Sequence, residues 1–214
     1  MKTLLKTAAI LLMLLSTTVF IACDKNDDDN DTPDSNTPTL SQADADGLIF
    51  MREEEKLARD SYIRMFELWS EQVFTNISES EQTHMDLLFD RVEQYGLTNK
   101  DLVLPDTGKF INDDLQTLYN QLIAQGKDST IAAFIVGATI EEVDIVDLVK
   151  FIDATSNENL KCTYDVLLIG SRNHLRAFVK NMNGMGYTYA PQFLSQTDYD
   201  AIINGSHEKA HSCD

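Results

Sequence analysis

Four separate stretches of the sequence place acidic or histidine residues inside an otherwise apolar pattern. Within each stretch the apolar residues recur at steps of three and four, so the polar residues among them share the buried face of a helix. The polar residues at these positions are Glu55, Glu81, His84, Glu142 and His174. Carboxylate and imidazole groups that meet inside a helical bundle are ligands for divalent transition metals. The pattern therefore predicts a buried metal site.

Glu81 and His84 form the sharpest of these motifs. Their Glu-x-x-His spacing puts one oxygen ligand and one nitrogen ligand on a single face of a helix. Ionised carboxylates at one level of an apolar interior would repel one another and take up protons, and bound cations resolve this conflict. Carboxylate-rich sites with one histidine for each metal suit iron, with manganese as the alternative, better than zinc. We therefore expect a di-iron site.

The third stretch leaves open which carboxylate faces inward. One apolar stripe passes through Ala138 and Ile145 and includes Glu142, whereas a competing stripe through the same two residues includes Glu141. The two glutamates lie about 100° apart around a helix, and the sequence does not choose between them. Asp144 shares a face with Glu141. Both glutamates are therefore candidate ligands, and Asp144 is an additional one.

Four long helices are needed to position these residues. The apolar spacing predicts them over residues 41–70, 72–95, 129–155 and 156–183. Short links join the first helix to the second and the third to the fourth, which makes antiparallel neighbours. A long link over residues 96–128 separates the two pairs and contains a short helix of its own, and another short helix begins at Ser195. No stretch alternates with a period of two, so we expect an all-α ferritin-like four-helix bundle with one long crossover and short accessory helices.

Four blocks of sequence carry a resemblance to a known family. They span Met51–Asp60, Ser80–Met85, Ile140–Ile145 and Gly170–Phe178. In this order they resemble the helix motifs of a bacterial family known as domain of unknown function 2202, within the ferritin-like superfamily. The resemblance covers about residues 43–203 and implies a bundle related to rubrerythrin and bacterioferritin, with no established activity. The spacing from Glu55 to Tyr62 also resembles the first helix of ferritins, where a tyrosine lies near the metals.

One position departs from the superfamily pattern. That pattern has a second Glu-x-x-His motif on the fourth helix, whereas this chain has Ser171 three residues before His174. One carboxylate ligand is therefore missing, and Asp144 or Glu141 are the candidates to supply it. The alternatives are an asymmetric pair of metals, a single metal, or a relic that has lost its metal.

The first 38 residues are typical of targeting signals. Residues 1–22 combine Lys2 and Lys6 with an apolar run that is short for a membrane span, as in an export signal peptide. Cys23 follows directly and resembles the acylated cysteine of bacterial lipoproteins. The alternative is an ordinary secretory signal that leaves Cys23 as a free thiol.

Residues 23–38 are acidic and polar, which predicts a disordered tether. An acidic run after a lipidated cysteine resembles the surface-export signal of Bacteroidetes lipoproteins. It implies a chain attached to the outer membrane through Cys23, on the cell surface or on the periplasmic face. The folded domain is then expected over residues 39–205, followed by a flexible tail over residues 206–214.

The charge balance excludes one class of partner. The 214 residues include 17 basic and 35 acidic side chains, for a net charge of −18. Nucleic-acid binding needs clustered Lys and Arg residues, so we expect no nucleic-acid partner.

Two cysteines besides Cys23 are present. Cys162 and Cys213 could pair in an exported protein, but their spacing does not establish a disulfide. His207, His211 and Cys213 form a loose motif near the end of the chain, where frayed termini rarely bind metal.

Three hypotheses about function follow. In the first, a surface lipoprotein uses a di-iron site to react with oxygen or peroxide, with His84 and His174 capping metals that the carboxylates hold and bridge. The sequence has no Cys-x-x-Cys motif, so this chemistry needs an external electron donor. In the second, the bundle is a non-catalytic binding or adhesion module in which any metal stabilises the fold. In the third, the protein scavenges metal without turnover.

Overall fold

The computed structural model describes residues 40–97 and 103–213. The predicted signal peptide, Cys23 and the tether over residues 23–38 lie outside these residues. Every regular element in the described part of the chain is helical, which confirms the all-α prediction. The helices are α1 (Gln42–Trp69), α2 (Gln72–Gln94), α3 (Asp113–Gly126), α4 (Thr130–Ala154), α5 (Glu158–Gly184) and α6 (Gln196–Asn204). None of the described helices is long and apolar enough to cross a membrane.

Local side-chain chemistry explains where these helices begin. In α1 and α3 to α6, the side chain before the helix accepts a hydrogen bond from a backbone N–H of the first turn. These capping residues are Ser41, Asn112, Ser129, Asn157 and Ser195. Ser70 follows the last residue of α1 and adopts a left-handed backbone with φ of 56°, which ends the helix before the short turn into α2.

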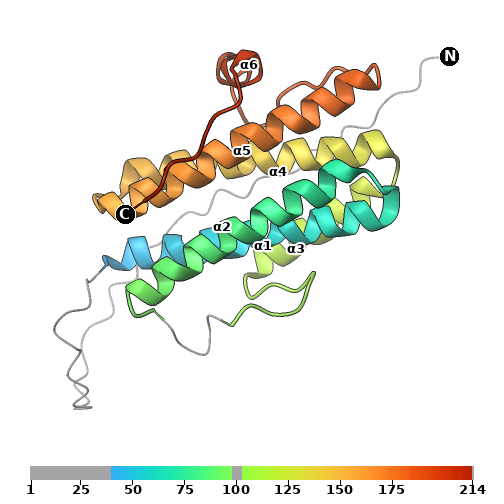
Figure 1. The fold of residues 1–214 in the computed structure, drawn as a ribbon. Coiled ribbons are helices and arrows are strands. Elements are labelled where there is room, and N and C mark those ends of the chain that lie inside the picture. Colours follow the sequence, from blue (N-terminus) through green and yellow to red (C-terminus); the bar gives the residue numbers. More distant parts are fainter. Residues whose placement is uncertain (1–39, 98–102, 214) are drawn as a thin grey trace, which may run out of the picture. The chain divides into compact units, whose positions relative to one another are not determined.

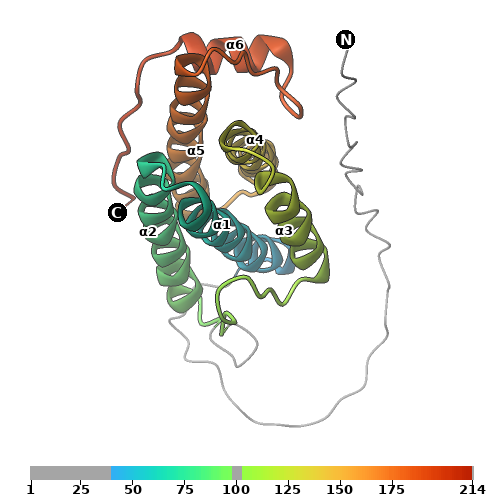
Figure 2. The ribbon, with the colours of Figure 1, turned by 90° about the vertical axis from the view of Figure 1, so that its right-hand side faces the viewer.

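The four long helices form two antiparallel pairs. α1 packs along α2, and α4 packs along α5 (Figure 1). α4 begins at the end of the bundle opposite to the one where α2 ends, so α2 and α4 run in the same direction (Figure 1). α1 also contacts α4, and α2 contacts α5. α3 lies beside α1 and α4, as Figure 2 shows. The four long helices surround one interior, and α3 lies outside it.

An aromatic cluster fills one part of this interior. The rings of Phe74 and Phe134 stack with centroids 5.3 Å apart, and Phe178 lies 5.6 Å from Phe74 and 5.2 Å from Tyr62. Gly137 makes room for this packing, because a Cβ there would lie 2.6 Å from the Phe178 ring. These side chains are fully buried, so the cluster keeps water away from the polar residues that lie next to it.

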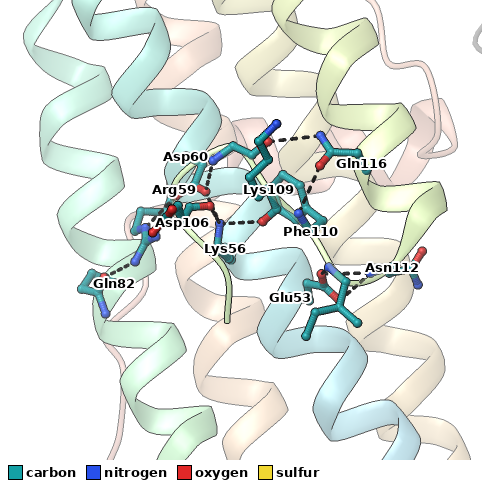
Figure 3. A network of polar contacts seen from close by, with 12 residues as sticks. Glu53, Lys56, Arg59, Asp60, Gln82, Asp106, Lys109, Phe110, Asn112 and Gln116 are labelled. Carbon is teal, nitrogen blue, oxygen red and sulfur yellow. Dashed lines mark hydrogen bonds and ion pairs between the residues drawn. The ribbon is translucent and has the colours of Figure 1, made fainter. Parts of the chain in front are cut away.

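A buried polar clamp holds the long link on α1 (Figure 3). Lys56 is only 1% exposed; it forms an ion pair with Asp60 and donates to the carbonyl oxygens of Asp106 at 3.1 Å and Lys109 at 3.0 Å. One turn earlier, Glu53 accepts hydrogen bonds from the backbone N–H groups of residues 111 and 112. The link thus covers this face of α1, and Glu55 lies on a different face.

The C-terminal residues lie against α5 instead of forming the predicted flexible tail. Glu208 makes ion pairs with Arg172 and Arg176 of α5. Cys162 of α5 forms a disulfide with Cys213, so the pairing that the sequence left open is present. These contacts join residues far apart in the sequence, which is why local composition does not reveal them.

Candidate metal centre

Glu81 of α2 lies between two histidines. Its Oε2 atom is 2.8 Å from Nδ1 of His84, and its Oε1 atom is 2.9 Å from Nδ1 of His174. His84 belongs to the same helix as Glu81, whereas His174 comes from α5. All three side chains are buried. Each oxygen of one carboxylate therefore faces a different imidazole nitrogen, as in a carboxylate that bridges two metal ions.

A second carboxylate completes each half of this arrangement. Glu55 of α1 places Oε2 at 3.1 Å from Nδ1 of His84, and Glu141 of α4 places Oε2 at 3.5 Å from Nδ1 of His174. Within each half, one ligand atom from each residue lies within 4.8 Å of the others. The two groups of three residues share Glu81. All four long helices contribute, so the centre depends on the whole bundle.

Several potential metal-ligand atoms of this centre have no hydrogen-bond partner among the described residues. Oε1 of Glu55, Oε1 of Glu81 and Nδ1 of His174 are buried, yet none has a hydrogen bond within the described part of the chain. Nδ1 of His174 and Oε1 of Glu81 are close, but they are not aligned as donor and acceptor. Buried polar atoms without a partner are rare in folded proteins, and cations bound in the two groups would satisfy these three. The residues present therefore fit a metal centre.

Each histidine is held in place by its surroundings. Nε2 of His174 hydrogen bonds to Oγ of Ser80 at 3.0 Å, which leaves Nδ1 free to act as a ligand. The ring of His84 packs directly on Gly170, where a Cβ would lie 2.5 Å from its Cε1 atom. Sequence reasoning missed both Ser80 and Gly170. A glycine in the middle of a helix is unfavourable, and this was the signal that could have identified Gly170.

Tyr62 connects the centre to the aromatic cluster. Its hydroxyl donates a hydrogen bond to Glu141 and lies 3.4 Å from the carbonyl oxygen of Gly137. The hydrogen bond stabilises the ionised carboxylate of Glu141 and fixes its position. Tyr62 thus contacts a carboxylate of the candidate centre.

Burial and neighbouring charges shift the pKa values of the ligands in both halves. Burial opposes ionisation of Glu81, but the neighbouring charges of His174 and His84 outweigh it and lower the pKa of Glu81. Burial and the negative charge of Glu81 raise the pKa of Glu55 to about 8 and that of Glu141 to about 7. Burial opposes protonation of His174, but Glu81 and Glu141 overcome it and raise its pKa to about 10. In the metal-free protein, protons on Glu55, Glu141 and His174 reduce the negative charge that bound cations would neutralise.

Glu142 lies outside the centre, unlike the expectation that it was a candidate ligand. Its carboxylate accepts hydrogen bonds from the hydroxyl of Tyr189 and from the backbone N–H groups of Gln192, Phe193 and Leu194. These bonds hold the segment after α5 and use the oxygens that a metal would need. Of the two stripes on this helix, the one through Glu141 faces the centre.

Asp144 lies beside the centre but in neither group of three. Ser171 donates a hydrogen bond to one of its oxygens, and its Oδ1 atom has no hydrogen bond to the described residues. Burial, followed by the charges of Glu55 and Glu54, raises its pKa well above the ordinary value. Ser171 thus contacts a carboxylate from the neighbouring helix, at the position where α5 lacks one of its own.

The structure brings together five of the predicted ligands. They are Glu55, Glu81, His84, Glu141 and His174. A third group of potential ligands forms at the surface, where Cys162 lies near His211 and Cys213. The predicted lipidation site at Cys23 lies outside the described residues.

Comparison with known proteins shows where the chain belongs. Residues 44–206 match a family described as "Uncharacterized protein domain (DUF2202)". The uncharacterized protein MJ0754 from Methanocaldococcus jannaschii is 47% identical over 171 residues, which cover 79% of this chain and 91% of that protein. The crystal structure of hypothetical protein MJ0754 from Methanococcus jannaschii superposes with a TM-score of 0.76 at 45% identity, over 80% of this chain and 97% of that one. The chain therefore belongs to the DUF2202 family.

Proposed function

We propose that this protein is a ferritin-like protein with a di-metal centre bridged by Glu81. The observation that carries the proposal is the position of Glu81, whose two oxygens face two different histidines. One metal would lie between Glu55, Glu81 and His84, and the other between Glu81, Glu141 and His174. The donor set of three carboxylates and two imidazoles favours iron, with manganese as the alternative.

The ferritin-like assignment rests on topology and on the origin of the ligands. Two antiparallel helix pairs joined by one long crossover are the arrangement found in ferritin-like bundles. In such bundles a glutamate comes from each of two helices and a Glu-x-x-His motif from the other two. Here α1 and α4 supply Glu55 and Glu141, α2 supplies the complete motif, and α5 supplies His174 alone.

A bound di-iron pair would supply the electrons and the open coordination positions for reduction of oxygen or peroxide. Around it, the chain's own residues would orient the ligands and exclude water. Ser80 orients His174, Gly170 permits the position of His84, and Tyr62 holds Glu141. The aromatic cluster shields the Tyr62 side of the centre. Turnover would require an external electron donor.

Metal loading of the purified protein tests this proposal. Anaerobic reconstitution with ferrous iron should give two irons per chain, and exposure to oxygen should then produce the absorption of an oxo-bridged ferric pair. Glu81→Gln should lose both metals, because Glu81 belongs to both groups. Glu79→Gln, at an exposed position on the same helix, is the matched control and should bind two irons. Failure to bind either iron or manganese would overturn the proposal.

One observation favours a second candidate, a non-catalytic module that metal stabilises. Ser171 replaces a carboxylate, and Asp144 hydrogen bonds to it instead of joining either group. Such a module would gain melting temperature on metal loading but would not consume oxygen or peroxide. A metal scavenger would also show no consumption, and its metal would exchange reversibly with a chelator.

We also propose that the protein is attached to the outer membrane through lipidated Cys23, on the cell surface or on the periplasmic face. The support is the sequence of residues 1–38 alone. Mass spectrometry of detergent-extracted protein should find an acylated N-terminal Cys23. Cys23→Ala should abolish acylation, and a native protein with an unmodified Cys23 would contradict the anchor.

A further inference from the structure

The end of the chain is held on the outer surface of α5. From α6 the chain runs back along α5 and ends near the start of that helix (Figure 1). Glu208 pairs with Arg172 and Arg176 along the way, and Arg91 of α2 donates to the carbonyl oxygen of Cys213 at 3.1 Å. The Cys162–Cys213 disulfide closes this attachment.

Three side chains of types that bind metal meet at this disulfide, and Asp165 lies beside one of them, His211. Cys162 and Asp165 are one turn apart on α5 and therefore lie on the same face of the helix. His211 and Cys213 are two residues apart in the tail. One ligand atom each of Cys162, His211 and Cys213 lie within 4.8 Å of one another, and Nε2 of His211 is 3.7 Å from Oδ2 of Asp165.

The site is open to solvent, unlike the centre around Glu81. The side chains of His211 and Asp165 are each 47% exposed. A disulfide does not require a neighbouring imidazole or carboxylate. Two sulfurs, one imidazole and one carboxylate together make a four-coordinate donor set, which zinc prefers.

We propose that reduction of the Cys162–Cys213 disulfide creates a zinc site formed by Cys162, His211 and Cys213, with Asp165 as the fourth ligand. The disulfide and the zinc site would be alternative states of the same residues. In the oxidised state the sulfurs are bonded to each other, so neither is a thiolate that can bind metal. The proposal is independent of the di-metal centre.

An external dithiol is the reductant that opens the Cys162–Cys213 disulfide. The dithiol gives two electrons and two protons, the S–S bond breaks, and the two cysteines become thiols while the dithiol becomes a disulfide. Zn²⁺ then displaces the two thiol protons into solvent. Re-oxidation by a disulfide oxidant would reverse both steps and release the zinc.

The fold keeps the ligands together after reduction. Zinc–sulfur bonds of about 2.3 Å place two sulfurs about 3.8 Å apart in a tetrahedral site, so the sulfurs must separate by about 2 Å. The ion pairs of Glu208 with Arg172 and Arg176 do not involve sulfur, so they hold the tail near α5 in both states.

Cobalt binding tests the proposal, because Co²⁺ occupies zinc sites and absorbs strongly when thiolate is a ligand. All samples carry Cys23→Ala, so that only Cys162 and Cys213 supply thiolates, and a phosphine keeps the reduced samples reduced. The reduced protein should bind one Co²⁺ with thiolate-to-cobalt charge-transfer absorption, and Zn²⁺ should displace it. The oxidised protein should lack this absorption. The carboxylate and histidine ligands around Glu81 cannot produce it.

Single substitutions identify which side chains bind the zinc. Cys162→Ser should lose the charge-transfer absorption, and His211→Ala should weaken zinc binding by more than the roughly 10- to 100-fold that loss of an outer-shell partner costs. His207→Ala, an exposed tail histidine outside the group, is the matched control and should bind zinc normally. Glu81→Gln should also retain the absorption, so failure of the di-metal centre would leave this result unchanged. A reduced protein without the absorption, or equal zinc affinity of His211→Ala and the control, would overturn the proposal.

Discussion

The imidazole of His84 rests on Gly170 so closely that a Cβ at position 170 would lie 2.5 Å from Cε1 and 2.6 Å from Nε2 of the ring. One ligand of the candidate centre is therefore positioned by the absence of a side chain on the opposite helix. Because Gly170 has no side chain, the His84 ring of α2 can lie directly against α5.

Gly170→Ala should consequently damage the metal centre while leaving the bundle folded. Alanine favours a helix by about 1 kcal/mol over glycine, but here its methyl group would displace His84 from Glu55 and Glu81. We expect loss of the metal that His84 would hold, with retained helicity by circular dichroism. Gly184→Ala, near the end of the same helix where a Cβ would meet nothing within 4 Å, should bind metal normally. Full metal content in Gly170→Ala would show that His84 is not a ligand.

Tyr62→Phe should weaken metal binding most at low pH. Its hydroxyl donates to Glu141 and lowers the pKa of that carboxylate against the effect of burial. Without the hydroxyl, Glu141 holds its proton more tightly, so a cation competes less well below about pH 7. The loss should be about 1 kcal/mol of binding free energy, typical of one hydrogen bond. Metal titrations at pH 6 and pH 8 measure it. Tyr189→Phe removes a hydroxyl from Glu142 instead and should leave affinity unchanged at both values.

The sequence predicts a ligand of the centre where helical spacing alone determines which face of the helix the residue occupies. Glu81 and His84 are three residues apart on one helix, so their common face followed from geometry alone. Glu141 and Glu142 are adjacent, and the choice between them depends on residues 189–194, which satisfy Glu142 from about 50 positions away. Helical periodicity contains no information about such a contact.

The run from Glu53 to Lys56 shows the same limit. Consecutive charged residues usually lie on a solvated face, yet all four are buried here. Glu53 and Lys56 are covered because the link over residues 106–112 folds onto α1 and takes up their hydrogen bonds. The helices and their order were predictable because caps and apolar spacing are local signals. The clamp and the docked tail were not, because their partners are distant in sequence.

Lys56→Met should destabilise the protein without emptying the metal centre. It removes the buried cation that pairs with Asp60 and binds two carbonyl oxygens of the link. We expect a loss of about 3 kcal/mol, the low end for breaking a buried ion pair, because Arg59 and the N–H of Gly108 still contact Asp60. Urea unfolding measures the loss. Metal content should be unchanged, since Glu55 lies on another face of α1; a variant that lost metal would tie the clamp to the centre.

Stability of the metal-free protein should fall as pH rises from about 6 to 9. The pKa values of Glu55 and Glu141 are raised in the folded state to about 8 and about 7, from an ordinary value of 4.5. A raised pKa stabilises the fold below the unfolded value and loses this contribution as pH rises through the folded value. The raised pKa of His174, about 10, acts in the same direction at higher pH. The expected result is a declining melting temperature in the presence of a chelator.

Metal loading should remove this decline, because cations replace the protons on Glu55 and Glu141. Loading at pH 7 should also release protons, measurable by calorimetry in buffers of different ionisation enthalpy. A metal-free melting temperature that stays level across this pH range would show that these carboxylates are not protonated in the fold.

Glu141→Gln and Glu142→Gln should separate the two roles of these adjacent glutamates. Glu141 has a raised pKa caused first by burial and then by Glu81, so replacing it with a neutral amide removes a charge that the metal-free fold accommodates poorly. That variant should lose metal and keep or gain metal-free stability at pH 8.

Glu142 accepts hydrogen bonds from three backbone N–H groups and from the Tyr189 hydroxyl. In Glu142→Gln the amide NH₂ group, itself a donor, would face some of these donors. We expect Glu142→Gln to lose about 1 to 3 kcal/mol of stability and to keep its metal. Thermal unfolding and metal analysis of both variants give the comparison, and metal loss in Glu142→Gln with retention in Glu141→Gln would reverse the assignment of the α4 ligand.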